Sequence, residues 1–343
     1  MTKLYFGQDV DQSALNGVRV ALLGYGSQGR AQALNLRDSG ISVDLGLRPD
    51  GQSWRQAEAD GWQPQTVPEA VKGADYVVFL MPDMAQPEVF RNEVEPHLKS
   101  GMTLHFAHGF NIHYGAIRVG PGVDVTLVAP KGPGRLVRRQ FEAGKGVPCL
   151  VAVQQDATGK ALEKALAFAH AIGGTRAGVL TTTFAEETET DLFGEQAVLC
   201  GGATELVKQG FETLVAGGYQ PEVAFFECLH ELKLIVDLLY EGGFAKMHEF
   251  VSDTAKYGDL TRGPMVIDRA VRTNMERVLE EIRDGSFARE WMAESADGAT
   301  HYRRLLAQDL AHPIEEVGQR LRARMSWLQE RGIPQPMPQE VGP

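Results

Sequence analysis

The stretch Val18-Arg-Val-Ala-Leu-Leu-Gly24-Tyr-Gly-Ser-Gln-Gly29 decides the fold of the N-terminal half. An apolar run of strand type leads into glycines spaced GxGxxG, and a helical pattern follows. In such a unit the glycines allow a tight turn, a close approach of backbone to pyrophosphate, and close packing of helix on strand. The N–H groups at the start of the helix attract the anion. The stretch therefore predicts a dinucleotide-binding loop made of Gly24, Tyr25, Gly26, Ser27, Gln28 and Gly29.

Outward from this loop, short β-rich runs alternate with helical stretches up to about Thr183, which is a βαβ rhythm. Beyond it long helical patterns replace the strands, opened by a capping-box pattern at Thr183-Phe-Ala-Glu186. We predict a Rossmann-like, doubly wound parallel sheet over 1–183, an all-helical domain over 184–328, and a mobile, proline-rich tail over 329–343. The predicted strands are Val18–Leu23, Ile41–Leu47, Tyr76–Met81, Thr103–Ala107, Val123–Val128 and Val147–Val153.

The composition excludes several classes of protein. Among 343 residues, 45 acidic side chains outnumber 34 basic ones, so the surface has no broad positive field and we expect no nucleic-acid partner. No apolar stretch is long enough to span a bilayer, and the start of the chain lacks the pattern of a signal peptide. Cys149, Cys200 and Cys228 lie in apolar surroundings without CxxC spacing, which indicates reduced core thiols. We expect a cytoplasmic protein without a membrane partner.

The end of the second predicted strand bears on the choice of dinucleotide. An NAD-type fold often carries an acid there, whereas this chain has Arg48, which favours a 2′-phosphate. Ser53 would add a hydrogen bond to that phosphate, but Asp50 in the same loop would repel it. The residues therefore leave the choice between NADPH and NADH open.

Two basic residues follow predicted strands at the edge where ligands bind in open α/β sheets. His108 follows Thr103–Ala107, and Lys131 follows Val123–Val128 within the stiff loop Pro130-Lys-Gly-Pro-Gly134. Such a loop would hold an ammonium group near an anionic substrate. A histidine in a loop is often only a solvated side chain, so the argument is stronger for Lys131.

Two carboxylate pairs at i,i+4 spacing lie on predicted apolar helix faces, Asp191 with Glu195 and Glu227 with Glu231. A buried carboxylate must be protonated, paired with a cation or bound to metal. Four oxygen donors without a Cys or His pattern suit Mg²⁺ or Mn²⁺ better than Zn²⁺, and two Mg²⁺ would balance four charges. The alternative is that each carboxylate pair lies on a solvated helix face, or forms ion pairs with Lys and Arg, without any metal. We interpret Glu186, Glu187 and Glu189 differently, as first-turn acids favoured by the helix dipole without any site.

Together the pieces GYGSQG, FAHGFNIHYG, APKGPG, ETETDLFGEQAVLCGG and FECLHELKLIVDLLYEGG resemble ketol-acid reductoisomerase in its short form, in order from about Tyr5 to Trp327. The resemblance implies an alkyl shift in 2-acetolactate or 2-aceto-2-hydroxybutyrate followed by reduction with NAD(P)H, in valine and isoleucine synthesis. NADPH is the usual reductant of that family, and NADH use is a further hypothesis here. The substrate class is a 2-hydroxy-2-methyl-3-keto acid.

The resemblance also implies roles for individual residues. His108, Lys131 and Glu231 would be catalytic, with Glu231 transferring a proton, and Ser252 would contact the substrate carboxylate. Two Mg²⁺ would be held by Asp191, Glu195, Glu227 and Glu231. The helical domain would be knotted and would form at least a homodimer in which the second copy supplies Glu227 and Glu231. The implied cofactor contacts are Gly24, Tyr25, Gly26, Ser27, Gln28, Gly29, Arg48, Ser53, Asp83 and Gly134.

The chain departs from the family in the cofactor region. Gly51 stands where a phosphate-binding serine is frequent, and Arg30 stands where histidine is common. The resemblance assigns no role to Arg30. Two rival functions remain at this stage: a metal-independent hydroxyacid dehydrogenase, which does not need the carboxylate pairs, and a dinucleotide-sensing protein without turnover, which needs neither these nor His108 and Lys131.

Overall fold

The structure, a computed structural model, describes residues 3–325 of the chain, and these divide into two compact units between Asp191 and Leu192. The boundary between the units falls inside helix α8 (Phe184–Gly194). The expected tail over 329–343 lies outside the described residues. No helix in the described part combines the length and the apolar character that crossing a membrane requires.

An eight-stranded sheet forms the centre of the first unit, in the order β1-β8-β7-β6-β5-β4-β2-β3. All six predicted strands are present, with ends within two residues of the predicted ones. The strands are β1 (Leu4–Tyr5), β2 (Val20–Leu23), β3 (Val43–Gly46), β4 (Tyr76–Phe79), β5 (Thr103–Phe106), β6 (Asp124–Pro130), β7 (Cys149–Gln155) and β8 (Val179–Thr181).

The sheet is mixed rather than wholly parallel, which corrects one detail of the prediction. Strands β3, β2, β4, β5 and β6 are parallel neighbours, but β7 runs antiparallel to β6 and β1 antiparallel to β8. Strands β1 and β8 were not predicted because they are only two and three residues long. The order β3-β2-β4-β5-β6 retains the switch point beside β2 that is typical of a Rossmann-like fold.

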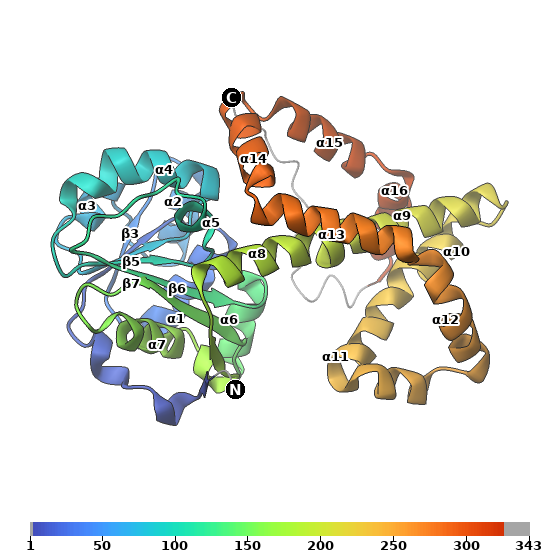
Figure 1. Cartoon of the computed structure of the whole chain (residues 1–343), viewed down its shortest axis with the longest axis horizontal. Coiled ribbons are helices and arrows are strands. Elements are labelled where there is room, and N and C mark those ends of the chain that lie inside the picture. The colour runs from blue at the N-terminus through green and yellow to red at the C-terminus, as the bar shows by residue number, and fades with distance from the viewer. Residues whose placement is uncertain (1–2, 326–343) are drawn as a thin grey trace. The chain divides into compact units, whose positions relative to one another are not determined.

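Helices cover both faces of the sheet, as Figure 1 shows for this unit. One hydrophobic core packs α1 and α7 against the sheet, and a second packs α3 and the π-helical turn η4 against the other face. The helices of the unit are α1 (Ser27–Asp38), α2 (Gln52–Ala59), α3 (Val67–Val71), α4 (Gln86–Val89), α5 (Phe110–His113), α6 (Gly134–Glu142), α7 (Ala161–Ala171) and the start of α8; the short turns are η1 (Gly7–Asp9), η2 (Gln12–Leu15), η3 (Asp83–Ala85), η4 (Phe90–Val94), η5 (Glu95–His97) and η6 (Gly174–Arg176).

A small polar network lies inside the first core. Tyr76 on β4 is hydrogen-bonded through its hydroxyl to Nδ1 of His105 on β5 at 2.7 Å, and Thr126 on β6 lies 2.9 Å from the same nitrogen. All three side chains are fully buried. Burial lowers the pKa of His105 to about 3, so this histidine is neutral at physiological pH.

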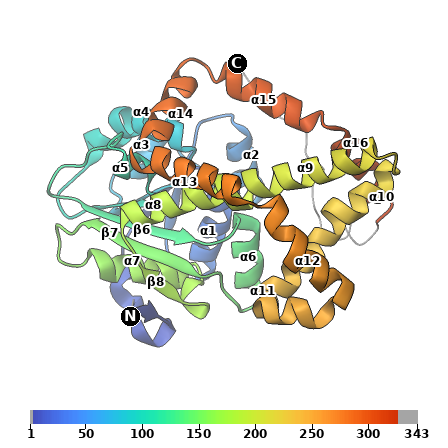
Figure 2. The ribbon, with the colours of Figure 1, turned by 45° about the vertical axis from the view of Figure 1, so that its right-hand side comes forward.

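The second unit is helical throughout its described residues, as predicted. Its core lies where α9, α10 and α16 meet (Figure 2), and its buried members include Phe211, Phe225 and Ile314. The elements of the unit are η7 (Glu195–Leu199), α9 (Gly201–Ala216), α10 (Pro221–Phe225), η8 (Phe226–His230), α11 (Glu231–Phe250), α12 (Asp253–Val266), α13 (Arg269–Arg283), α14 (Ser286–Ala296), α15 (Thr300–Leu310) and α16 (Pro313–Arg322).

Much apolar surface of this unit is uncovered. Helices α11 and α12 contain no buried residue, although α11 is rich in Leu before the non-helical backbone of Gly242 and Gly243 interrupts it. Tyr240 is 90% exposed and Phe244 76% exposed. An apolar helix is stabilised mainly by burying one face, and the described residues of this chain do not bury the apolar face of α11.

Candidate active site

The predicted site residues of the first unit meet at one edge of the sheet. The glycine loop follows β2, Asp83 follows β4, His108 follows β5 and Lys131 follows β6. Because these four strands are parallel, their carboxyl ends share an edge. This is the edge at which open α/β sheets bind ligands.

The glycine loop has the shape that a dinucleotide requires. Gly24 has a φ of +102°, and a Cβ there would lie 2.7 Å from the backbone of Leu80, so only glycine fits. A Cβ on Gly26 would meet no atom within 4 Å, which leaves open space beside the start of α1. Gly26 is the N-cap of α1 and has no side chain to satisfy the helix N–H groups. The loop therefore offers both room and donors to a pyrophosphate.

The loop that carries Lys131 packs directly on the glycine loop. Gln28 donates a hydrogen bond from Nε2 to the carbonyl oxygen of Gly132 at 2.9 Å. A Cβ on Gly134 would lie 2.0 Å from the carbonyl oxygen of Ser27, so the start of α6 touches the start of α1. A nucleotide on the glycine loop is thereby placed beside the Lys131 loop.

Four side chains form an ion cluster at this edge. The ammonium group of Lys131 lies 3.1 Å from Oε1 of Glu187 and 2.8 Å from Oδ1 of Asp191. Nδ1 of His108 lies 3.3 Å from Oε2 of Glu187 and 3.5 Å from Oδ2 of Asp191. The backbone N–H of Gly109 donates to Oε2 of Glu187 at 3.0 Å. Each carboxylate is thus shared between the same two cations.

This arrangement determines which groups carry charge. Burial alone would lower the pKa of His108, but the hydrogen bond with Glu187 and the charges of Glu187, Asp83 and Asp191 raise it to about 9. Burial would raise the pKa of Glu187, yet His108 and Lys131 hold it below its usual range. At neutral pH the cluster contains an imidazolium, an ammonium and carboxylates, so His108 has a proton to donate rather than a free base.

Asp83, the predicted cofactor contact after β4, lies next to this cluster. Burial raises the pKa of its carboxyl group, and the charges of Glu187 and Asp191 act in the same direction against that of His108. Its carboxylate accepts a hydrogen bond from Gln86 at 3.1 Å, and its carbonyl oxygen accepts one from Asn111 at 2.9 Å. The loops after β4 and β5 are therefore held together.

Glu187 is a residue whose part in the site the sequence interpretation missed. The sequence pattern assigns Glu187 to the helix dipole alone, but its side chain is 1% exposed and lies between His108 and Lys131. It does stand in the first turn of α8, where Thr183 accepts a hydrogen bond from the N–H of Glu186 as the capping pattern predicted. The available signal was spacing, because Glu187 precedes Asp191 by four residues and shares its helix face.

The cluster is also a possible metal site. One donor atom from each of His108, Glu187 and Asp191 lies within 4.8 Å of the others, and residues 3–325 contain no other such group of three. Carboxylate oxygens are the donors that Mg²⁺ prefers. Lys131 and the protonated His108 occupy the same carboxylates, so a divalent cation would have to share or displace them.

Asp191 is the last residue of the first unit, whereas the other three predicted metal ligands belong to the second unit. Glu195, Glu227 and Glu231 are exposed, so the predicted apolar burial of the Glu227 and Glu231 pair is wrong for the single chain. The helix is also not regular there, since Glu195 begins the π-helical turn η7 and Glu227 lies in η8. Single π-helical turns are frequent at functional sites. Ser252 is exposed and caps α12 by accepting a hydrogen bond from the N–H of Ala255 at 3.2 Å.

The predicted 2′-phosphate loop forms a tight turn. The N–H of Gly51 donates to the carbonyl oxygen of Arg48 at 3.4 Å, and Asp50 has a φ of +59°. Pro49 followed by a residue with positive φ is typical of a type II turn. Arg48 and Asp50 are exposed, and Ser53 occupies the second position of α2 behind the N-cap Gly51, which has no side chain. The turn therefore brings both an attractive and a repulsive charge to the start of α2.

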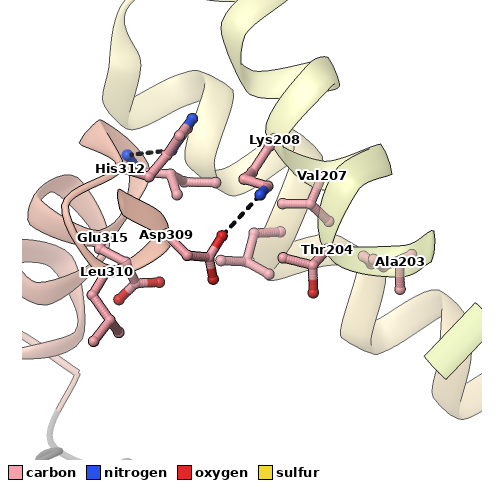
Figure 3. Close-up of a pocket in the computed structure, with 11 residues that line it drawn as sticks. Ala203, Thr204, Val207, Lys208, Asp309, Leu310, His312 and Glu315 are labelled. Carbon is pink, nitrogen blue, oxygen red and sulfur yellow. Dashed lines mark hydrogen bonds and ion pairs between the residues drawn. The ribbon is translucent and has the colours of Figure 1, made fainter. Parts of the chain in front are cut away.

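A different hollow lies in the second unit (Figure 3), with a volume of about 280 Å³. Its walls are mainly apolar, and Lys208 from α9 points to Asp309 from α15, 2.8 Å away. Its ammonium group also pairs with Glu205. The lining also includes Glu315 and His312, and Nε2 of His312 lies 3.2 Å from Oε1 of Glu212. None of the predicted site residues lines this hollow, and its Lys208 and His312 are paired with carboxylates of the same unit, so it is a poorer candidate for the chemistry.

Both units of the chain match families of known proteins. Residues 14–178 match the family described as acetohydroxy acid isomeroreductase, NADPH-binding domain, and residues 184–327 match ketol-acid reductoisomerase, C-terminal domain. The chain is similar to the solved structure of an NADH-preferring ketol-acid reductoisomerase from an uncultured archean. The two are 43% identical with a TM-score of 0.92, over 94% of this chain and 98% of that one.

More distant structures share only the fold. A semialdehyde dehydrogenase NAD-binding protein from Cupriavidus necator is 18% identical with a TM-score of 0.61, over 78% of this chain and 99% of that one. A pyrroline-5-carboxylate reductase from Coxiella burnetii is 12% identical with a TM-score of 0.53, over 78% of this chain and 98% of that one.

Proposed function

This chain belongs to the ketol-acid reductoisomerase family and has its NAD(P)H-dependent activity in branched-chain amino-acid biosynthesis, and we propose that the His108, Lys131, Glu187 and Asp191 cluster is its reaction centre. The substrates we propose are 2-acetolactate and 2-aceto-2-hydroxybutyrate. The observation that carries the proposal is the contact of this cluster's Lys131 loop with the glycine loop. The family membership excludes the two rival functions, a metal-independent dehydrogenase and a non-enzymatic sensor.

The residues present fit a magnesium centre. Asp191 lies with Glu187 in the oxygen-rich cluster, and Glu195, Glu227 and Glu231 offer further carboxylates of the type that Mg²⁺ prefers. Two Mg²⁺ held by Asp191, Glu195, Glu227 and Glu231 would supply Lewis-acid polarisation of the substrate oxygens. Glu187 is then the carboxylate that stays with His108 and Lys131.

The side chains of the cluster have separate tasks in this proposal. Lys131 is an ammonium group held in a short loop, suited to orienting the oxygens of an anionic substrate. His108 is protonated at neutral pH and is aligned by Glu187, so it can hold or donate a proton beside the substrate. The group that accepts a proton must be a different one, and Glu231 is our candidate. The nicotinamide supplies the hydride.

We propose NADPH as the reductant, with NADH also accepted. Arg48 and Ser53 at the start of α2 favour a 2′-phosphate, and the family match is to an NADPH-binding domain. Asp50 in the same turn opposes the phosphate, and the archaeal relative prefers NADH.

A second copy of the chain completes the site in this proposal. Glu227 and Glu231 are exposed in the single chain, and α11, which begins at Glu231, buries none of its residues. A homodimer, or a larger assembly built from it, would cover this apolar surface and bring these acids to a partner's cluster. Ser252 would meet the substrate carboxylate from the same unit. Cys149 is buried, as predicted for a core thiol, but Cys200 is exposed and Cys228 is only partly buried, so the prediction of core thiols is wrong for these two in the single chain. We propose a cytoplasmic location, where free thiols stay reduced.

The first experiment follows nicotinamide absorbance with 2-acetolactate and Mg²⁺, with NADPH and NADH in parallel and EDTA as a control. We expect metal-dependent oxidation with both nucleotides. Asp191→Asn and Glu227→Gln should each abolish it while nucleotide binding persists. The control is Asp237→Asn, because Asp237 is a partly exposed acid of α11 whose carboxylate pairs with Lys233, and this variant should retain activity. EDTA-resistant turnover would refute the metal proposal, and full activity of Glu227→Gln would remove that residue from the site.

A further inference from the structure

One carboxylate, that of Asp60, joins three segments of the nucleotide-binding unit. Asp60 caps the C-terminus of α2. Arg30 on α1 donates to it twice, from Nε at 2.6 Å and from Nη2 at 2.9 Å, and the hydroxyl of Tyr25 in the glycine loop donates at 2.9 Å. Paired donation from a guanidinium group to a carboxylate is among the stronger and more directional hydrogen-bond arrangements. The glycine loop, α1 and α2 are thus fastened at a single point.

A further contact from α1 reinforces this point. Arg37 donates from Nη1 to the backbone carbonyl oxygen of Asp60 at 2.9 Å, and its guanidinium group lies 4.7 Å from the ring centre of Trp62. The chain around Asp60 is therefore held by one side-chain and one backbone attachment to α1.

The Asp60 carboxylate is only 14% exposed, so these hydrogen bonds are partly shielded from water. The hydrogen bond from Arg30 is the main reason that the pKa of Asp60 lies below its usual range. Tyr25 is 4% exposed, and its pKa is raised by burial and by its bond to Asp60. The network therefore contains a carboxylate, a guanidinium and a neutral hydroxyl at neutral pH.

The position of this network matters for a dinucleotide. Tyr25 and Arg30 line a cavity of about 170 Å³ together with Ser27 and Gly134, at the start of α1 and α6. Asp60 lies at the C-terminus of α2. The N-terminus of α2 follows the turn that contains Asp50, and the adenosine ribose of a dinucleotide binds there in this fold. Because α2 has only eight residues, holding its C-terminus also fixes its N-terminus relative to the glycine loop.

We infer that Asp60 is a positioning residue for the dinucleotide, which holds the pyrophosphate loop and the ribose-binding end of α2 at the separation that NADPH and NADH require. Arg30, which has no assigned role, is the cationic half of this device. Its Nε and Nη2 atoms both bond to Asp60. The inference depends on dinucleotide binding by this domain and not on the metal or the ketol-acid substrate.

The test measures the dissociation constants of NADPH and NADH by calorimetry on the full chain, without metal or substrate. Asp60→Asn should weaken both about tenfold, which corresponds to about 1.4 kcal/mol. The matched control is Glu58→Gln, which removes a charge from the same end of α2, where the Glu58 carboxylate accepts a hydrogen bond from Trp54 in the same helix. It should bind both nucleotides as the unchanged chain does.

A second variant tests the network without removing a charge. Tyr25→Phe should weaken both nucleotides about threefold, and the double variant with Asp60→Asn should bind no more weakly than Asp60→Asn alone, because both act through one carboxylate. At saturating nucleotide kcat of Asp60→Asn should stay within about twofold while KM rises. Dissociation constants equal to those of Glu58→Gln, even with a lowered melting temperature, would overturn the inference.

Discussion

Replacing Glu187 by Gln would test whether this buried carboxylate controls the charge of His108. Glu187 is 1% exposed and contacts His108, Lys131 and the N–H of Gly109. Glutamine has the same size and can still accept from Gly109. Its amide N–H groups, however, would face His108 or Lys131, which are themselves donors, so the fold is retained while the charge balance is lost.

The magnitude follows from the pKa of His108. A pKa of about 9 lies about 2.5 units above the ordinary value of 6.5, and each unit corresponds to 1.36 kcal/mol, so the site favours the protonated ring by about 3 kcal/mol despite its burial. The hydrogen bond and the charge of Glu187 raise the pKa of His108 most strongly, against the lowering effect of burial. We therefore expect the pKa of His108 to fall by at least about two units in Glu187→Gln, and turnover at pH 7.5 to fall about 100-fold.

The assay is a histidine NMR titration of both proteins, with His108→Asn used to assign the resonance. Because the folded pKa of His108 is raised, its contribution to stability is complete below pH 6.5 and disappears as the pH rises through about 9. The difference in free energy of unfolding between the two proteins should accordingly be larger at pH 6.5 than at pH 9.5. A His108 resonance that titrates at the same pH in both proteins would refute this reasoning.

Three further perturbations have expected outcomes. Gly134→Ala places a Cβ 2.0 Å from the carbonyl oxygen of Ser27 and should weaken NADPH binding, measured by calorimetry, more than tenfold. In the control Gly132→Ala the Cβ meets side-chain atoms at 3.3 Å, so its affinity for NADPH should stay within twofold of that of the unchanged chain. Equal affinities of the two variants would contradict the packing argument. Asp50→Asn keeps a residue type that tolerates positive φ and removes the negative charge that would repel the 2′-phosphate. The ratio of NADPH to NADH affinity should rise about fivefold, which corresponds to about 1 kcal/mol for a charge in an exposed loop. An unchanged ratio would show that Asp50 does not face the ribose. Burial lowers the pKa of His105 to about 3, so the free energy of unfolding is highest above pH 6.5, where the ring is neutral in both states. It should fall by up to about 1.4 kcal/mol per pH unit as the pH decreases towards 3. Denaturant titrations at pH 6.5 and 4.5 should show this decrease, and the contribution of His105 to it should be missing in His105→Gln.

The nucleotide-binding half could be predicted from the sequence because its signals are local. Alternating strands and helices, the spacing of Gly24, Gly26 and Gly29, and the placement of His108 and Lys131 after strands all depend on neighbouring residues. Parallel strands then bring the ends of β2, β4, β5 and β6 to one edge. The short strands β1 and β8 could not be predicted, since two or three residues carry no periodicity. Strand β7 was predicted, but its antiparallel direction was not, because a strand's own residues do not show which way its neighbour runs.

Only the tertiary structure decided which acids belong to the cluster. Glu186, Glu187 and Glu189 look alike as first-turn acids of one helix, but α8 is placed so that Glu187 alone of these is buried between His108 and Lys131. Arg30 likewise acquires a partner 30 residues away in sequence, Asp60. Charge, burial and pKa depend on which distant groups the fold brings together, whereas strand, turn and helix signals depend on the chain's own neighbours.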